Sequence, residues 1–168
     1  MAYTEIDKSS DYFNTVLYTG NDTDNRTVSG VGFQPDFLWI KARNNADSHY
    51  LQDVVRGSTK VISSDSSSAE DTRVSAVKSF ASDGFVLGQE AQVNGNNNTY
   101  VSWNWKAGTS VSGNTTGSGT SKSYTGSVNT DAGFSIIKYI GNGTSGHTIP
   151  HHLGVQPQVV ICKRINQG

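Results

Sequence analysis

The sequence predicts an all-β fold, an antiparallel β-sandwich module followed by the start of a second repeat. Three observations predict it. Short runs of β-branched and aromatic residues alternate with polar ones, turn residues separate these runs at close spacing, and no long stretch carries the apolar period of a helix. Charged residues make up only 16% of the chain, so Ser, Thr and Asn must supply most of its polar surface. These residues favour strands and turns over helices.

The strands follow in order along the first hundred residues. In chain order, the segments predicted as strands are 13–19, 37–40, 50–55, 77–80, 85–87 and 100–105. Segment 37–40 is apolar on both faces, which predicts a central, buried strand. Asp83-Gly84 between two of the runs predicts a hairpin turn.

The segment 100–105 alternates cleanly between two faces. Val101, Trp103 and Trp105 lie on one face, and the opposite face carries Tyr100 and two polar residues. We expect the indoles to be buried in the core, so that Trp103→Ala would cost about 3–5 kcal/mol.

Two segments have less definite patterns. Ser67 to Glu70 fits a capping box, which leaves a short helical turn or a loop open. Residues 108–127 consist mostly of Gly, Ser, Thr and Asn, and within them we expect 108–118 to be loose and 121–128 to form a paired strand.

The chain contains a partial copy of itself. Residues 13–21 reappear as 134–142 at an offset of 121, and residues 32–41 reappear as 154–163 at an offset of 122. Such self-similarity indicates a duplicated structural unit. The predicted organisation is therefore an N-terminal arm, a first module, a connection and the start of a second module, with bounds 1–10, 11–107, 108–130 and 131–168.

Composition excludes several classes of function. The formal net charge is −1 and no run of basic residues stands out, so a nucleic-acid partner is not expected. No apolar run is long enough to predict membrane insertion, and no secretory signal is recognisable. The one cysteine, Cys162, aligns with Ile40 of the first repeat, which predicts packing inside a buried strand.

The candidates for chemistry are few. The densest group of potential metal ligands is His147, His151 and His152, and Asp22 with Asp24 resembles half of a calcium loop. The repeat counterparts of both groups lack these side chains, so we expect no metal and no other cofactor. Five acids could in principle form a glycosidase pair, namely Asp65, Glu70, Asp71, Asp83 and Glu90. All five lie in turn regions, where carboxylates are usually solvated, so we predict no enzyme and no catalytic residue, and leave the ligand-binding residues open.

Several motifs together resemble a known family. They are 11–20, 34–41, 55–57, 83–88 and 103–108, and the likeness resumes at 131–165. In order and spacing these motifs are similar to repeated modules in tail and tail-fibre structural proteins of tailed bacteriophages. The resemblance implies a concanavalin-like (jelly-roll) sandwich, a structural role in the virion and contact with other tail proteins, without catalytic residues to carry over.

The expected function is therefore a virion structural protein, a tail-fibre or other tail component, acting in host attachment and assembled in the host cytoplasm. Two alternatives stay open, a lectin-like module that binds host cell-surface glycans and a capsid decoration protein. Because the second repeat stops after the equivalent of 41, we expect its apolar segments 134–141 and 157–165 to be covered by further chain, by the first module or by another subunit. A homo-oligomer follows from the last option, and the resemblance implies a trimer.

Overall fold

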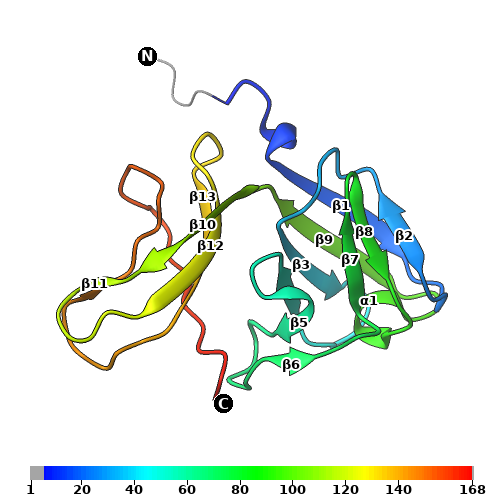
Figure 1. The fold of residues 1–168 in the computed structure, drawn as a ribbon. Coiled ribbons are helices and arrows are strands. Elements are labelled where there is room, and N and C mark those ends of the chain that lie inside the picture. Colours follow the sequence, from blue (N-terminus) through cyan, green and yellow to red (C-terminus); the bar gives the residue numbers. More distant parts are fainter. Residues whose placement is uncertain (1–5, 168) are drawn as a thin grey trace.

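The computed structural model describes residues 6–167 and consists of two β units in succession (Figure 1). The first unit is a sandwich of a six-stranded sheet, in the order β1-β9-β3-β4-β5-β6, and a three-stranded sheet, in the order β2-β8-β7. Every strand pair is antiparallel. The predicted all-β antiparallel sandwich is confirmed.

Six of the nine strands of the first unit were predicted, and those over 26–29, 57–62 and 71–72 were not. The nine strands are β1 (Phe13–Thr19), β2 (Arg26–Ser29), β3 (Phe37–Ala42), β4 (Tyr50–Asp53), β5 (Gly57–Ile62), β6 (Asp71–Thr72), β7 (Val77–Ala81), β8 (Gly84–Leu87) and β9 (Thr99–Trp105). Strand β4 ends earlier than predicted, because 54–56 form a turn. Strand β3 is central, as expected, but its burial alternates instead of covering both faces.

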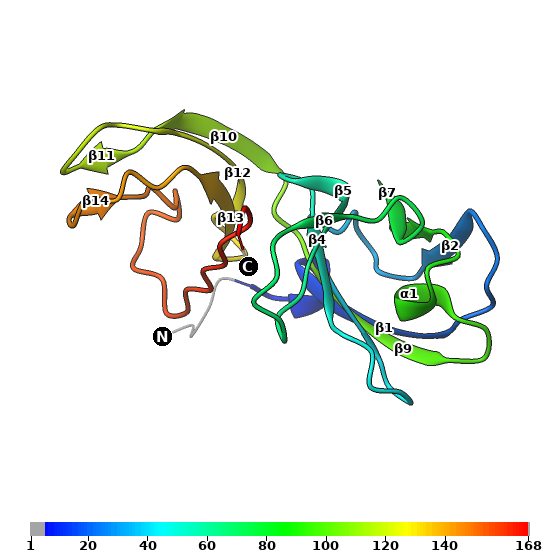
Figure 2. The same cartoon turned by 90° about the horizontal axis from the view of Figure 1, so that it is seen from below.

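The core lies between the two sheets. Its largest fully buried apolar side chains are Tyr100, Phe85, Leu38, Ile40 and Leu87. Figure 2 shows the two layers, with β1 and β9 on one side and β2 and β7 on the other. The short helix α1 (Ala91–Asn94) closes one end and contributes Val93, which is fully buried.

The tryptophans of β9 face away from this core, so their predicted orientation is wrong. Tyr100, Ser102 and Asn104 are fully buried, whereas Val101, Trp103 and Trp105 are half-buried on the opposite face. Hydrogen bonds from the Ser102 hydroxyl and the Asn104 amide nitrogen help the core to accommodate these polar residues. The Asn104 amide donates to Asn14 O at 3.0 Å and the Ser102 hydroxyl to Val16 O at 3.4 Å.

Helical structure is sparse, and none of it lies at 67–70, where the capping-box pattern left a short helical turn open. Residues 66–70 form a loop, so of the two alternatives left open there the loop is right. The helix α1 was not predicted, and a 3₁₀ turn, η1, spans Ser9–Asp11. The part of the predicted arm before residue 6 lies outside the described residues.

The second unit is smaller and more open. It contains β10 (Thr109–Asn114), β11 (Thr116–Gly117), β12 (Ser123–Asn129), β13 (Phe134–Tyr139) and β14 (His147–Thr148). The sheet order is β10-β12-β13, and β11 pairs with β14. The expected strand at 121–128 is confirmed, but the expected looseness of 108–118 is wrong, since β10 pairs with β12 over its whole length. A ladder needs only backbone groups, so the Thr- and Ser-rich segment can pair without bulky side chains.

The backbone of the second unit repeats that of the first in detail. Four positions with positive φ recur in the second unit at the sequence offsets of 121 and 122, namely Asp22 with Gly143, Asn25 with Gly146, Gly30 with His152, and Gly32 with Gly154. The turn after the first strand also recurs, because Thr23 N donates to Asn21 Oδ1 and Thr144 N donates to Asn142 Oδ1. The strand β13 is therefore the counterpart of β1.

The counterpart of β3 is not a strand. Residues 157–163 have no strand pairing, and Val159, Val160 and Ile161 are 77%, 76% and 74% exposed. Cys162 is exposed too, so its predicted burial is wrong. The reason is topological: β3 pairs with β9 on one side and β4 on the other, whereas no strand within residues 6–167 pairs with 157–163.

Candidate binding surfaces

The outer face of the six-stranded sheet carries most of the aromatic surface. One row across the sheet is Phe13, Trp105 and Phe37, and the next is Thr15, Trp103 and Trp39. These are direct cross-strand neighbours, the positions at which aromatic pairs stabilise a sheet.

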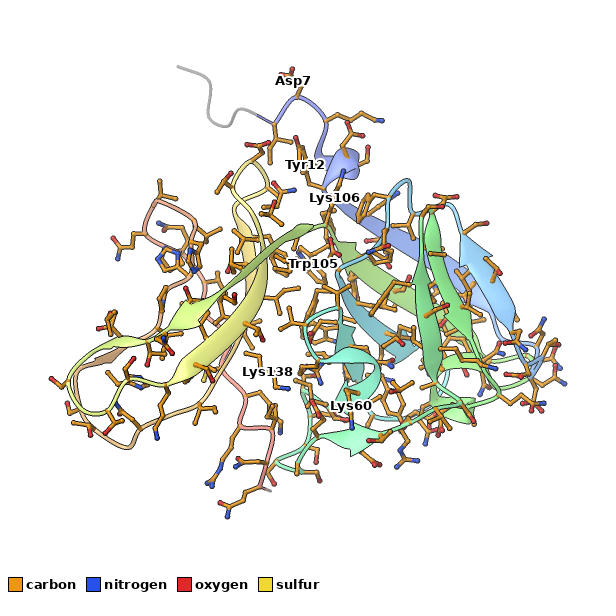
Figure 3. The ribbon with its side chains drawn as sticks, in the orientation of Figure 1. Asp7, Tyr12, Lys60, Trp105, Lys106 and Lys138 are labelled. Carbon is orange, nitrogen blue, oxygen red and sulfur yellow. The ribbon has the colours of Figure 1, made fainter. Side chains whose placement is uncertain are left out.

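The first row forms the joint between the two units. Phe134, the first residue of β13, stacks on Trp105 with ring centroids 5.9 Å apart and an interplanar angle of 19°. It also meets Phe37 edge-on at 6.0 Å, and Phe13 lies 4.8 Å from Trp105. Trp105 lies where the first unit faces the second (Figure 3). We call Phe13, Phe37, Trp105 and Phe134 the aromatic joint.

Polar contacts reinforce the aromatic joint along the connecting chain. The carboxylate of Asp36 accepts from Ala107 N at 2.7 Å, and Gly108 N donates to the Ser127 hydroxyl at 3.0 Å. Burial raises the pKa of Asp36, and the hydrogen bond from Ala107 opposes this shift. The exit of the chain from β9 is thereby fixed against both units.

A shallow hollow of about 410 Å³ lies beside the aromatic joint. It is lined from the first unit by Val54 and Val55 and from the second by Val111, Gly126 and four small polar residues of β10 and β12. It is open and bounded by short side chains, so it lacks the convergent polar groups of a catalytic pocket.

The second aromatic row holds a tryptophan pair that the joint leaves free. Trp39 and Trp103 meet edge-to-face, with centroids 6.0 Å apart. The Trp39 indole N–H donates to His49 Nδ1 at 2.7 Å, which fixes its ring. Leu17 lies on the same face and is 61% exposed. Half-exposed indoles held rigidly on a sheet face are suited to stacking against a flat apolar ligand surface.

A second, polar hollow of about 470 Å³ lies between the 46–48 and 63–71 loops. Its lining includes Asp47, Asp71, Arg73 and several serines. Arg73 pairs with the carboxylates of Asp71 and Glu90, at 2.7 Å and 3.7 Å. The single guanidinium in the lining is thus already engaged by two carboxylates of the protein.

A buried ion pair links β4 and β5 of the six-stranded sheet near this hollow. Arg56 Nε donates to Asp53 at 2.6 Å, and its Nη1 contacts Glu70 at 3.1 Å. Arg56 also donates to the carbonyls of Leu51 and Lys60. With these partners the guanidinium fixes the β4–β5 hairpin, so the Val55-Arg56-Gly57 motif has a structural role.

Each of the five acids considered for catalysis is engaged by a hydrogen-bond or ion-pair partner. Asp83 accepts from Gly30 N and Gly32 N, Asp65 accepts from His49 N, and Glu70 binds Arg56. Asp71 and Glu90 share Arg73, as described above. Because all five carboxylates are engaged in this way, they do not form the free pair across a cleft that a glycosidase needs.

The residues considered for metal binding are also separated. His147 Nε2 contacts the Thr115 hydroxyl at 2.6 Å, His152 Nε2 contacts the Tyr124 hydroxyl at 2.8 Å, and His151 Nδ1 accepts from Leu153 N. Asp24 forms an ion pair with Lys78, which lowers the pKa of its carboxyl. Among residues 6–167 no three His, Cys, Asp or Glu side chains are grouped as a metal would require.

The sequence analysis missed the aromatic joint and the half-buried tryptophan pair on the outer face of the sheet. Both involve residues it assigned to the core, and the signal that could have found them was on the opposite face of β9. Tyr100 there has an apolar ring that can pack and a hydroxyl that bonds Ala91 O. No helix in the part of the chain that the structure describes is long and apolar enough to cross a membrane.

Comparison with known proteins identifies a family to which the chain belongs. No curated protein and no solved structure matches the chain. A family model described as a domain of unknown function (DUF7483) matches residues 8–168, which include both units and the joint. The chain belongs to the DUF7483 family.

Proposed function

We propose that the protein is a structural component of a bacteriophage virion, a tail-fibre or other tail part that serves host attachment. The observation that carries the proposal is the aromatic joint. Phe134 of the second unit packs on Trp105 and Phe37 of the first, so successive copies of the repeat are held in a fixed orientation. An extended fibre needs such joints, because modules joined by free hinges would not stay aligned along one axis.

Further support comes from the repeat and from the resemblance of its motifs to phage tail modules. The recurring turns mean that the same unit is built twice along the chain. The contacts of the candidate residues agree, since each acid considered for catalysis and each histidine considered for metal binding is engaged by another group of the protein.

Immunogold electron microscopy tests the proposal. Antibodies raised against the purified chain are added to phage particles from the source of the sequence, and gold is expected on the tail or its fibres. Gold on the capsid would favour the decoration role, and unlabelled particles that contain the intact chain by mass spectrometry would contradict a surface-exposed tail role.

A second candidate function, a lectin-like module, is favoured by one observation. Trp39 and Trp103 lie on the outer face of the sheet, where an indole can stack on a sugar ring. A glycan array probed with the chain and with Trp103→Ala tests it. Binding that the substitution abolishes would support the candidate, and a matched change at Val74, an exposed residue away from this face, should leave such binding intact.

A further inference from the structure

The indole of Trp39 is held by a hydrogen bond whose acceptor is a histidine. Its N–H donates to Nδ1 of His49 at 2.7 Å, and the two rings meet edge-on with centroids 5.7 Å apart. Trp39 lies in β3, and His49 directly precedes β4, the neighbouring strand of the six-stranded sheet. The bond therefore joins β3 to the start of β4 on the face that carries the tryptophan pair.

This bond requires the neutral form of the imidazole. The indole N–H is a donor only, so Nδ1 of His49 must supply a lone pair and the ring proton must sit on Nε2. In the imidazolium both nitrogens carry a proton, so no orientation of the ring offers an acceptor. Protonation of His49 therefore breaks the bond. The bonds of His147 and His152 differ, because their partners are hydroxyls, which both donate and accept.

The side chain of His49 is the part that responds to a proton. It is half-buried, as is that of Trp39, so water reaches both rings. The backbone of His49 is fixed, because its N–H donates to the Asp65 carboxylate at 3.2 Å. Gain of a charge on the imidazole therefore moves the two rings apart and leaves the loop in place.

Other charged groups lie on the elements around His49. Lys41 and Arg43 come from β3 and the turn after it, and Asp47 and Asp65 come from the adjoining loops. The Lys41 ammonium already donates to two backbone carbonyls. Strands β1 and β9, which complete this face, carry no charged residue. Carboxyl, ammonium and guanidinium groups ordinarily titrate outside the interval of about pH 5–8, in which histidine changes its charge. A transition in that interval on this face therefore reports His49.

Trp39 in turn forms one half of the tryptophan pair. It lies directly across from Trp103 of β9, and the two rings meet edge-to-face with centroids 6.0 Å apart. The hydrogen bond to His49 fixes the rotation of the Trp39 ring, and without it only ring contacts remain. An indole that has lost its one hydrogen bond on a half-exposed face reorients more freely, so the shape of the pair depends on the charge of His49.

We propose that His49 is a pH-sensitive switch for the tryptophan pair on the outer sheet face. The neutral imidazole holds the Trp39 indole in place, and the imidazolium releases it. A flat ligand that needs both rings in place is then bound at neutral pH and released in mild acid. This consequence rests on the lectin-like candidate function, whereas the switch itself does not.

Nuclear magnetic resonance of the purified chain tests the switch without a ligand. The imidazole signals of His49 and the indole N–H signal of Trp39, identified by its loss in Trp39→Phe, are followed from about pH 8 to about pH 5. We expect the indole proton to shift upfield with the same midpoint as the imidazole titration. The order parameter of the indole N–H should fall across the transition, because the released ring gains motion on the picosecond to nanosecond timescale.

A pair of asparagine variants separates His49 from the histidines of the second unit. His49→Asn places an amide oxygen at the position of Nδ1, so the bond forms but does not titrate, and the Trp39 signal should stay constant with pH. His151→Asn makes the matching change where Nδ1 accepts from Leu153 N, and it should keep the transition. Circular dichroism checks that both variants retain their β content.

Three results would overturn the proposal. They are a His49 imidazole that stays neutral down to about pH 5, a Trp39 indole signal that does not follow the imidazole, and an equal transition in folded His49→Asn. The titration of the wild-type chain alone decides the first two, whatever the stability of the variants. Glycan binding enters none of these measurements, so failure of the lectin-like candidate leaves the switch standing.

Discussion

Arg56 is a guanidinium almost entirely withdrawn from water, with its side chain 5% exposed. A buried cation is tolerated only when its hydrogen bonds are satisfied, and Asp53, Glu70 and two carbonyls satisfy this one. Removal of the cation would leave Asp53, which is 4% exposed, as an unpaired buried charge.

We therefore expect Arg56→Ala to lower the free energy of unfolding by about 3–5 kcal/mol. Urea unfolding of the purified chain measures it. The control is Arg73→Ala, whose ion pairs are partly exposed and should be worth less than about 1 kcal/mol. Equal losses in the two variants would mean that burial does not set the strength of these pairs.

Asp83 makes stability depend on pH in the acid range. Hydrogen bonds from Gly32 N and Gly30 N lower the pKa of its carboxyl below the usual value near 3.9. The folded state then binds the proton less readily than the unfolded state. The stabilisation is present above the unfolded pKa and is lost as the pH falls through the folded one.

Asp83→Asn should consequently lower the melting temperature at pH 7, and the difference from the wild type should shrink below about pH 4. Thermal melts across pH 2–7 measure this, with Asp131→Asn in an exposed turn as the control. A difference that stays constant with pH would contradict a role for the ionised carboxylate.

Strand β9 places its tyrosine and its tryptophans on opposite faces of the sheet. Tyr100 is fully buried, stacks on Tyr18 at 5.1 Å and donates its hydroxyl to Ala91 O. Trp103 packs on the outer face and retains contact with water. The core contribution of this strand therefore comes from its tyrosine.

Tyr100→Ala should cost about 3–5 kcal/mol, the range for a fully buried aromatic side chain. Trp103→Ala should cost about 1–2 kcal/mol, less than the sequence suggested, because only part of the indole area is removed from water. Urea unfolding of both variants decides the order. A larger loss for Trp103→Ala would place the core on the other face of the sheet.

In the whole molecule, the aromatic joint holds the two units of one chain together, whereas the exposed apolar segment 159–161 favours contact with another chain. Phe134 ties the second unit to the first within one chain. Val159, Val160 and Ile161 stay uncovered and favour association with another chain. We propose a homo-oligomer, with a trimer suggested by the phage resemblance, in which neighbouring subunits cover this segment.

Light scattering on the purified chain tests the assembly. We expect a closed oligomer at micromolar concentration, and the variant with Val159, Val160 and Ile161 all changed to Asn should be a monomer with unchanged β content. A wild-type monomer would contradict the proposed association.

Phe134→Ala should loosen the connection between the units without unfolding either. Residual dipolar couplings or small-angle scattering of the monomeric triple variant measure their relative order, and the control is Phe134→Tyr, which keeps the stacking ring. Unchanged inter-unit order in Phe134→Ala would show that the polar contacts of Asp36 and Ser127 are sufficient.

Local properties of this protein could be predicted from its sequence because they depend on nearby residues. The strand at 13–19, the Asp83-Gly84 hairpin and the recurrence of the unit are all written in short patterns of side-chain size and turn residues. The repeat even placed residues with positive φ at equivalent positions, since a turn conformation is set by a few adjacent residues.

Tertiary structure alone decided which face of each strand is buried and which edges are paired. A period of two defines two faces of β9 but does not say which meets the second sheet, and the polar face could be buried because Ser102 and Asn104 found hydrogen-bond acceptors. Likewise, 157–163 has the composition of β3 but is no strand, because a strand forms only when neighbours satisfy its backbone. In the first unit those neighbours come from segments far away in sequence, so no local pattern shows whether they are in place.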